Sequence, residues 1–368
     1  MAVHSPHSPG SREAVQAAHL AFTTALHQAR QRQIGQWLAP ASAGAPAPGL
    51  PTRRHYALVI AGQCHAVDPA SLLEAHGLDH EQLFLQTPEA DMADAGPWLI
   101  ALPPARDASL LSALSAQACD DALTLLASPI KLAPLAAHLR SFLHARLEGG
   151  DEDVPVLLRY FDPRIGFDAV EHWPAEARRA FLQPMTWWAG WDAQGQARRL
   201  SGPGRTAPMR HTQPMRLSRA WSDALATIGA PQLAAALLAE ELEETRHPDA
   251  HWMARMHPLL QRGIAREAMD FATGAGLVTW NEHLTACRQA LLTHAAFHTH
   301  PALAKALAAP PSQSDSAESA PPTLDALLTT LPASVRHGWL QDRDAALIRS
   351  YEARTAAMTH ALSKSTTA

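Results

Sequence analysis

The stretch VPVLLRYFDPRIG, residues 154–166, places an apolar run beside three charged side chains. Residues 154–160 are apolar enough to predict a buried strand, and Arg159, Asp162 and Arg164 cluster at its end. Two nearby arginines lower the pKa of a carboxyl group, so Asp162 would be a poor general base. An aspartate before proline is instead a natural start of a turn, and an arginine can bind its carboxylate with two parallel hydrogen bonds. The pattern predicts a structural latch built mainly on Arg159 and Asp162, with Tyr160 and Arg164 available as partner contacts.

On both sides of this stretch, strand and helix patterns alternate along residues 56–191. Short apolar runs predict strands at 56–60, 83–86, 98–102, 123–127, 154–160 and 185–191. Helical periodicity predicts helices at 71–77, 107–117, from Ser128 to Leu143, and at 168–181. Such alternation is typical of helices packed on a sheet, so residues 52–195 are predicted to form one mixed α/β lobe.

The rest of the chain carries mostly helical patterns. A helix is expected over residues 11–37, followed by a Pro/Ala-rich linker that completes an N-terminal segment, 1–51. Residues 215–308 are predicted to form an all-helical lobe, in which Leu233, Leu237, Leu238 and Leu242 of one helix face inward. A second linker (309–322) and C-terminal helices (323–368) follow. The predicted fold class is therefore α+β, with a mixed α/β N-terminal lobe followed by an all-helical C-terminal lobe.

Composition limits the classes of partner and compartment. The 368 residues have a formal net charge of -5, which argues against a broad basic surface for nucleic acid. Three widely spaced cysteines, Cys64, Cys119 and Cys287, fit reduced thiols in the cytosol. The first residues lack the apolar core of a signal peptide, and no run of about 18 apolar residues is evident. We expect a cytoplasmic protein without membrane insertion.

Familiar catalytic motifs do not occur in the sequence. It has no nucleophile elbow, phosphate-binding loop, dinucleotide fingerprint, H-E-x-x-H or C-x-x-C, so we expect no catalytic residue and no cofactor. His294, His298 and His300 are the candidate metal ligands, because His294 and His298 would share one face of a helix. The simpler interpretation is a histidine-rich helix end, where imidazolium suits the helix dipole. A metal-dependent hydrolase that uses this histidine-rich lobe remains the alternative function.

Three tryptophans lie in the predicted strand at 185–191. Side chains alternate along a strand, so Trp187 and Trp191 would point to one face and Trp188 to the other. Buried rings on both faces would make this a core strand. Exposed rings would instead mark a partner-binding surface, where aromatic residues are enriched.

Taken in order, several short motifs resemble the DUF4123 family over roughly residues 55–192. The motifs are Leu83-Phe84, Gly96-Pro97-Trp98-Leu99, Ser128-Pro129, His138-Leu139-Arg140 with Phe142-Leu143, Arg159-Tyr160-Phe161-Asp162-Pro163-Arg164, and the segment AFLQPMTWWAGWD at 180–192. One departure is that family members often carry an acidic residue just after the first strand, whereas none occurs here before Asp68.

The resemblance implies an adaptor, or chaperone, of the bacterial type VI secretion system. Such a protein binds a secreted effector toxin in the cytoplasm, helps to load it onto the VgrG spike protein and is not an enzyme. On this reading Tyr160, Arg164 and the tryptophan strand are candidate contacts on a surface that holds an effector segment. A purely structural subunit of a stable assembly is a third possibility.

Overall fold

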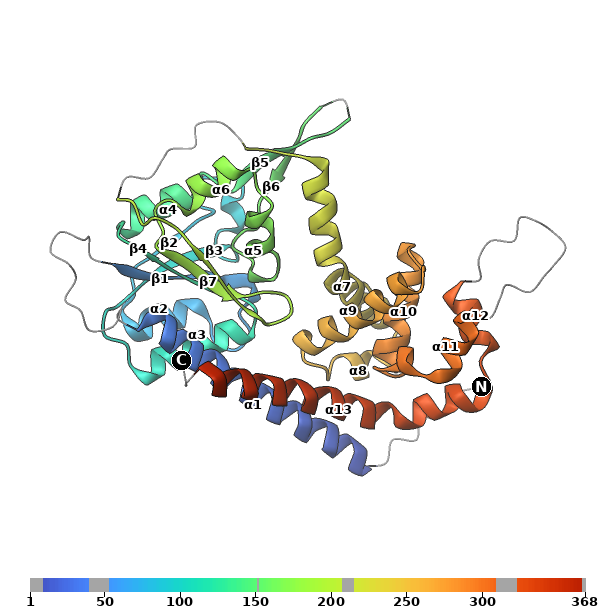
Figure 1. Ribbon diagram of the computed structural model, residues 1–368. Helices are drawn as coiled ribbons and strands as arrows, with labels where there is room; N and C mark the ends of the chain where they lie inside the picture. Colours follow the sequence, from blue (N-terminus) through green and yellow to red (C-terminus); the bar gives the residue numbers. More distant parts are fainter. Residues whose placement is uncertain (1–8, 40–52, 151, 207–214, 309–322, 366–368) are drawn as a thin grey trace. The chain divides into compact units, whose positions relative to one another are not determined.

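The computed structural model describes residues 9–39, 53–150, 152–206, 215–308 and 323–365 (Figure 1). The chain divides into two compact units. The sheet unit is residues 27–229, and the helical unit combines residues 1–26 with residues 230–368. Both boundaries fall inside helices, α1 (Pro9–Leu38) and α7 (Arg219–Glu244), rather than between the predicted lobes. The predicted linkers at 40–51 and 309–322 lie outside the described residues.

A sheet of six strands forms the centre of the sheet unit, and every neighbouring pair is antiparallel. Its spatial order is β2 (His80–Gln82), β3 (Pro97–Leu102), β1 (Arg54–Ile60), β4 (Leu123–Ser128), β7 (Trp187–Trp191) and β8 (Ala197–Ser201). In β1, Leu58 lies opposite Leu99 of β3 and Thr124 of β4. The inner strands read as continuous apolar runs because both faces of the sheet are covered.

Helices cover the two faces of this sheet, as Figure 1 shows. One face packs against α2 (Pro69–His76), α3 (Ala108–Cys119) and the last turns of α1. The other face packs against α4 (Leu132–Arg140), α5 (Pro163–Glu171) and α6 (Ala175–Leu182). Alternation along β1 assigns Ala57 and Val59 to the first core, and Tyr56, Leu58 and Ile60 to the second. The predicted fold class, a mixed sheet and helix region followed by a helical region, is thus confirmed.

A smaller sheet has the order β6-β5-β9 and also belongs to the sheet unit. It is built from β5 (His144–Leu147), β6 (Val154–Leu157) and β9 (Met215–Leu217). Strand β5 pairs antiparallel with β6 and parallel with β9. The predicted strand at 154–160 is therefore shorter than expected. Its Pro155 fits an edge strand, because proline cannot donate a hydrogen bond to a second neighbour.

The helical unit consists of packed helices. In the described chain they are α8 (Ala250–Met253), α9 (Pro258–Gly274), α10 (Trp280–Leu292), α11 (Pro301–Ala308), α12 (Leu324–Thr330) and α13 (Ala333–Ser365), with the first turns of α1 and the part of α7 from residue 230 on. One short 3-10 turn, Phe297–Thr299, lies in this unit, and two others, Ala61–Gln63 and Ala90–Met92, lie in the sheet unit. The Tyr351 hydroxyl accepts a hydrogen bond from the His257 N–H at 3.0 Å and lies 2.9 Å from Nδ1 of His19. This contact ties the start of α1 to α9 and α13.

Three elements predicted from the sequence differ from the structure. Residues 83–86 form a turn after β2, and Gln86 has a left-handed φ of 67°. Ser128 does not open a helix, because it ends β4 and its hydroxyl donates to the Pro184 carbonyl. The helix predicted at 168–181 is split into α5 and α6 around Pro174, which has no N–H to continue a helix.

Helix α7 also differs from its prediction. Leu238 and Leu242 are buried as expected, whereas Leu233 and Leu237 are 52% and 39% exposed. By length and composition α7 is long and apolar enough to cross a membrane, the only described helix of which this holds, although the apolar runs suggested none. Core helices of water-soluble proteins meet the same criterion, so this is weak support for a membrane span.

Candidate functional site

The charged cluster at the end of β6 is organised around Asp162. This carboxylate is 2% exposed and caps the N-terminus of α5, because Oδ1 accepts a hydrogen bond from the Arg164 N–H at 3.1 Å. The Arg164 guanidinium donates from Nε to Oδ1 at 2.8 Å and from Nη2 to Oδ2 at 2.7 Å. Arg159 Nη2 also donates to Oδ2 at 2.7 Å. Four donors within three residues of Asp162 thus hold one buried carboxylate, which closes the turn between β6 and α5.

The two arginines of this latch are not equivalent. The Arg164 side chain is 17% exposed, whereas that of Arg159 is 49% exposed. Burial opposes the charged form of Arg164, but the hydrogen bonds and negative charge of Asp162 outweigh this effect, and the pKa of Arg164 is raised. Arg164 therefore stays cationic. The Asp162 carboxylate is occupied by these donors, so it is badly placed to take a proton from a substrate.

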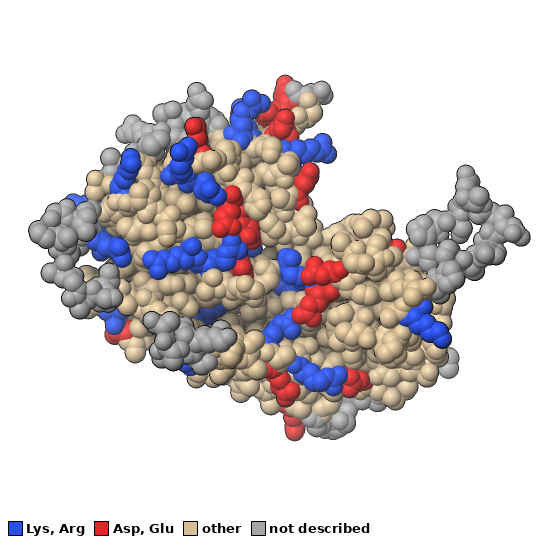
Figure 2. All heavy atoms as spheres, viewed as in Figure 1, with Lys and Arg blue, Asp and Glu red and all other residues tan. Residues whose placement is uncertain are grey.

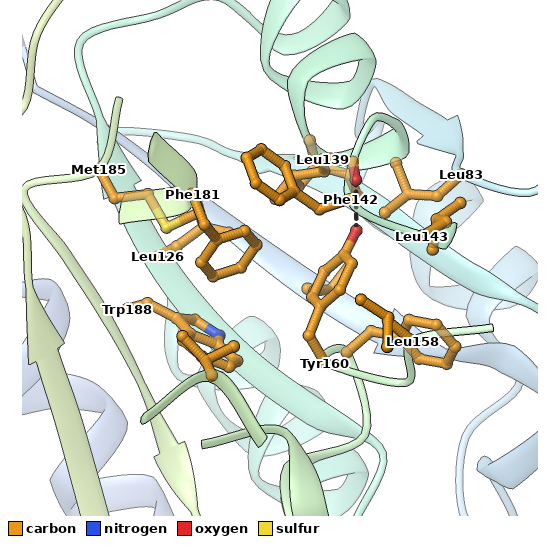
Figure 3. Close-up of a cluster of buried hydrophobic side chains, with 14 of the residues drawn as sticks. Leu83, Leu126, Leu139, Phe142, Leu143, Leu158, Tyr160, Phe181, Met185 and Trp188 are labelled. Carbon is orange, nitrogen blue, oxygen red and sulfur yellow. Dashed lines mark hydrogen bonds between the residues drawn. The ribbon is translucent and has the colours of Figure 1, made fainter. Parts of the chain in front are cut away.

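Tyr160 lies inside the core rather than on a surface. It is 1% exposed, and its hydroxyl donates to the Leu139 carbonyl at 2.9 Å, as drawn in Figure 3. Its ring meets Phe181 edge-on at a centroid distance of 5.0 Å. Complete burial raises the pKa of the Tyr160 hydroxyl above its usual range. In this structure Tyr160 has a structural role and cannot contact a partner directly.

Gly166 completes the latch at the start of α5. A Cβ atom built at this position would lie 1.9 Å from the Tyr160 carbonyl oxygen. The Gly166 N–H also donates to the Asp162 carbonyl at 2.7 Å. A side chain here would push the helix away from the turn, so glycine is required by close backbone approach.

The three candidate tryptophans are buried on β7. Trp187, Trp188 and Trp191 are 2%, 1% and 6% exposed. Trp187 and Trp191 belong to the core that contains α1 and α3, whereas Trp188 belongs to the opposite core and stacks on Phe167 at 4.3 Å. Figure 3 shows Trp188 inside this second cluster. The strand therefore fills both cores and offers no exposed aromatic platform.

The histidines considered as metal ligands occupy different structural positions. Helix α10 ends at Leu292, so the helical i, i+4 spacing assumed for His294 and His298 does not apply. His294 Nε2 lies 3.1 Å from Asp342 Oδ2, and burial lowers the pKa of His298, which packs against Phe271. His300 Nδ1 accepts the Ala302 N–H at the start of α11. Within the described residues, no group of three or more His, Cys, Asp or Glu side chains could hold a metal ion.

The loop after β1 supplies its carboxylate from another part of the chain. Asp68 caps α2 by accepting the Ser71 N–H at 3.0 Å. The N–H groups of His65 and Ala66 instead donate to Asp120 at 2.8 and 2.9 Å. The sequence departure noted after the first strand is thus accompanied by an acid that approaches from the end of α3.

Other residues were missed because their role depends on tertiary neighbours. Arg140 was noted only as part of a motif, yet its Nη2 donates to Glu81 Oε2 at 2.8 Å and to the Gln82 carbonyl at 2.9 Å, which joins α4 to β2. Strand β8 was also missed. The turn-forming residues DAQG at 192–195, followed by the alternating sequence ARRLS, were the available signal for a hairpin.

The comparisons with known proteins concern the part of the chain just described. The family model described as "Domain of unknown function (DUF4123)" matches residues 55–180, from β1 into α6. Searches of the curated proteins and of the solved structures gave no match. The match spans strands β1 to β4 of the main sheet, α4 and the Asp162 latch, and it stops before β7. The resemblance inferred from the ordered motifs is therefore supported for the segment 55–180, which is similar to DUF4123.

Proposed function

We propose that this protein is a non-catalytic cytoplasmic adaptor that binds a type VI secretion effector and helps to load it onto a VgrG spike. The observation that carries the proposal is the DUF4123 match over residues 55–180. The secretion role is what resemblance to that family implies. The structure adds the geometry of the charged cluster at residues 159–164.

The geometry favours binding over catalysis. The carboxylate of the Arg159-Asp162-Arg164 cluster is buried and occupied by arginine donors. Burial raises the pKa of each thiol, Cys64, Cys119 and Cys287, to about 12, so almost no thiolate nucleophile forms at neutral pH. The motif residues thus stabilise a scaffold, and an adaptor uses the outer surface of such a scaffold.

The test is capture of the tagged protein from its own cells, followed by mass spectrometry. The expected result is co-capture of a toxin-like protein together with a VgrG. Reciprocal capture with the tagged toxin should recover the adaptor, and deletion of the adaptor should abolish secretion of that toxin while other secreted proteins still leave the cell. An untagged strain controls for proteins that bind the resin.

Three outcomes would contradict the proposal. Recovery of the protein without any effector or spike protein, together with unchanged secretion in the deletion strain, would remove its basis. Stoichiometric zinc or iron in the purified protein would favour the metal-dependent hydrolase, and a permanent stoichiometric assembly would favour a structural subunit.

A further inference from the structure

Strand β8 is one edge of the six-stranded sheet. It pairs with β7 on one side and with no described strand on the other. Ala197, Arg199 and Ser201 are exposed, and Arg198 and Leu200 are partly buried. A free edge of this kind can accept an additional strand through main-chain hydrogen bonds.

The register shows which backbone groups of β8 point outward. The Asp192 N–H donates to the Gln196 carbonyl at 3.0 Å, and the Gly202 N–H donates to the Thr186 carbonyl at 3.3 Å. In an antiparallel pair, hydrogen-bonded and non-hydrogen-bonded positions alternate. The groups of Arg198 and Leu200 therefore face β7, whereas those of Ala197, Arg199 and Ser201 face away from it. These outward groups have no hydrogen-bond partner within the described residues.

A pocket of about 780 Å³ lies beside this edge, between β8 and α6. Its floor includes the apolar side chains of Leu182, Leu200 and Pro203. Its charged lining residues are Arg178, Arg179 and Arg205 together with Glu171 and Glu176. The Glu171 carboxylate is neutralised by Arg198 at 2.6 Å. Figure 2 shows Lys and Arg side chains gathered on the face of the sheet unit that carries α6 and the β7–β8 hairpin, with some acidic side chains beside them.

The arginines at the pocket differ from those used in structural ion pairs. Arg198 is committed to Asp168 and Glu171, at 3.2 and 2.6 Å. Arg179 donates from Nε to the Ala175 carbonyl at 3.3 Å, and its ion pair with Glu176, at 4.0 Å, is weak and exposed. No ion pair within the described chain involves Arg205 or Arg199. Arg199 lies over the Trp187 ring at 5.4 Å. Positive charge is therefore available on both sides of the free edge.

From this arrangement we propose that β8 is a strand-addition site for an extended, acidic segment of a partner protein. The segment pairs its backbone with the outward groups of Ala197, Arg199 and Ser201. Its side chains on the α6 side carry carboxylates to Arg178, Arg179 and Arg205. The alternate side chains, on the opposite side, are small and apolar and lie beside Arg199.

This inference deepens the proposed function, on which it rests for the identity of the partner: an effector or spike segment is the natural occupant. The binding chemistry itself does not depend on that identity. A peptide assay can therefore succeed even if the secretion role fails, and it can fail while an effector is still captured through another surface.

The test uses the full-length protein and two fluorescein-labelled synthetic peptides, Ac-EVEVEVEV-amide and Ac-KVKVKVKV-amide. Fluorescence anisotropy should show binding of the acidic peptide, weakened by added salt, and no binding of the basic peptide. Arg199→Pro removes an outward N–H while leaving the positions bonded to β7 untouched, and Arg199→Ala is its matched control because both lose the same charge. Affinity should be at least about tenfold lower for Arg199→Pro than for Arg199→Ala.

A second set of variants tests the charges. The triple change Arg178→Glu, Arg179→Glu and Arg205→Glu should abolish binding, whereas Arg146→Glu, an exposed position on β5, should leave it unchanged. Circular dichroism establishes that each variant is folded. Equal affinity for the Arg199→Pro and Arg199→Ala proteins, or no binding of the acidic peptide by the wild-type protein, would overturn the proposal. A dimer of the free protein that Arg199→Pro dissociates would overturn it too, because the edge would then bind a second copy.

Discussion

Replacing Asp162 by alanine is the most direct test of the latch. The change deletes the N-cap of α5, which costs about 1 kcal/mol, and it leaves Arg164 largely buried without its anion. Removing one partner of a buried ion pair costs about 3–5 kcal/mol. Because the two losses share one carboxylate and Arg164 keeps some access to solvent, we expect Asp162→Ala to lower the free energy of unfolding by about 3–5 kcal/mol in total.

Arg159→Ala is the matched comparison. In the wild-type protein the Arg159 guanidinium donates to Oδ2 of Asp162 at 2.7 Å, but the Arg159 side chain is 49% exposed. Exposed ion pairs contribute about 0–1 kcal/mol, so this variant should lose less than about 1 kcal/mol. Asp162→Asn keeps an acceptor for the Arg164 N–H while losing the charge, and it should fall between the two.

The free energy of unfolding is measured first, by urea titration with tryptophan fluorescence as the signal. The two compact units need not unfold together, so hydrogen exchange of the β4 and β7 amides should report the sheet unit separately. A loss below about 1 kcal/mol for Asp162→Ala, or equal losses for Asp162→Ala and Arg159→Ala, would refute the view that a buried carboxylate organises this turn.

Three further predictions concern other parts of the structure. Gly166→Ala should destabilise the sheet unit by about 3 kcal/mol or more in urea unfolding, because the added Cβ would clash with the Tyr160 carbonyl. Gly35→Ala in α1 is the control: its Cβ meets nothing within 4 Å, so it should stabilise the protein by about 0.5–1 kcal/mol. Equal changes in the free energy of unfolding for the two variants would contradict this prediction. Burial, with Arg106 nearby, lowers the pKa of His55 to about 4, so the unfolded state binds the extra proton and stability should fall as the pH drops from about 6.5 towards 4. His55→Gln should flatten that part of the profile of unfolding free energy against pH, and an unchanged slope would exclude His55 as its source. The three cysteines, whose pKa values are raised by burial to about 12, should react slowly with iodoacetamide at pH 7.5 and rapidly in urea, as monitored by mass spectrometry. Fast labelling of the folded protein would contradict the raised thiol pKa values.

Sequence reasoning succeeded where the interaction is local. In the latch, both arginines lie no more than three positions from Asp162, so the spacing could be interpreted directly. The predicted helices at 71–77 and 107–117 have local end signals of the same kind: Gly77 ends α2 with a left-handed φ of 59°, and Asp107 caps α3. Caps and turns depend on backbone groups that lie close by in the chain, whatever the fold around them.

It failed where two local preferences compete and the fold decides between them. Ser128-Pro129 resembles a helix start, yet Ser128 pairs with Arg54 of β1 and its hydroxyl donates a hydrogen bond to the Pro184 carbonyl. The predicted helix face of His294 and His298 disappears because α10 ends before both residues. Strands β5, β8 and β9 are short and carry polar residues, so their existence depends on the strands they pair with.

The central apolar strands, the main helices and the charged turn at residues 159–166 could be predicted from the sequence, because hydrophobic periodicity and helix capping depend on residues that are close in the chain. Tertiary structure alone decided the strand order β2-β3-β1-β4-β7-β8, and with it that Tyr160 and Trp188 are internal while β8 is an open edge. Pairing between distant strands depends on which faces and edges other elements leave uncovered, and this cannot be evaluated one segment at a time.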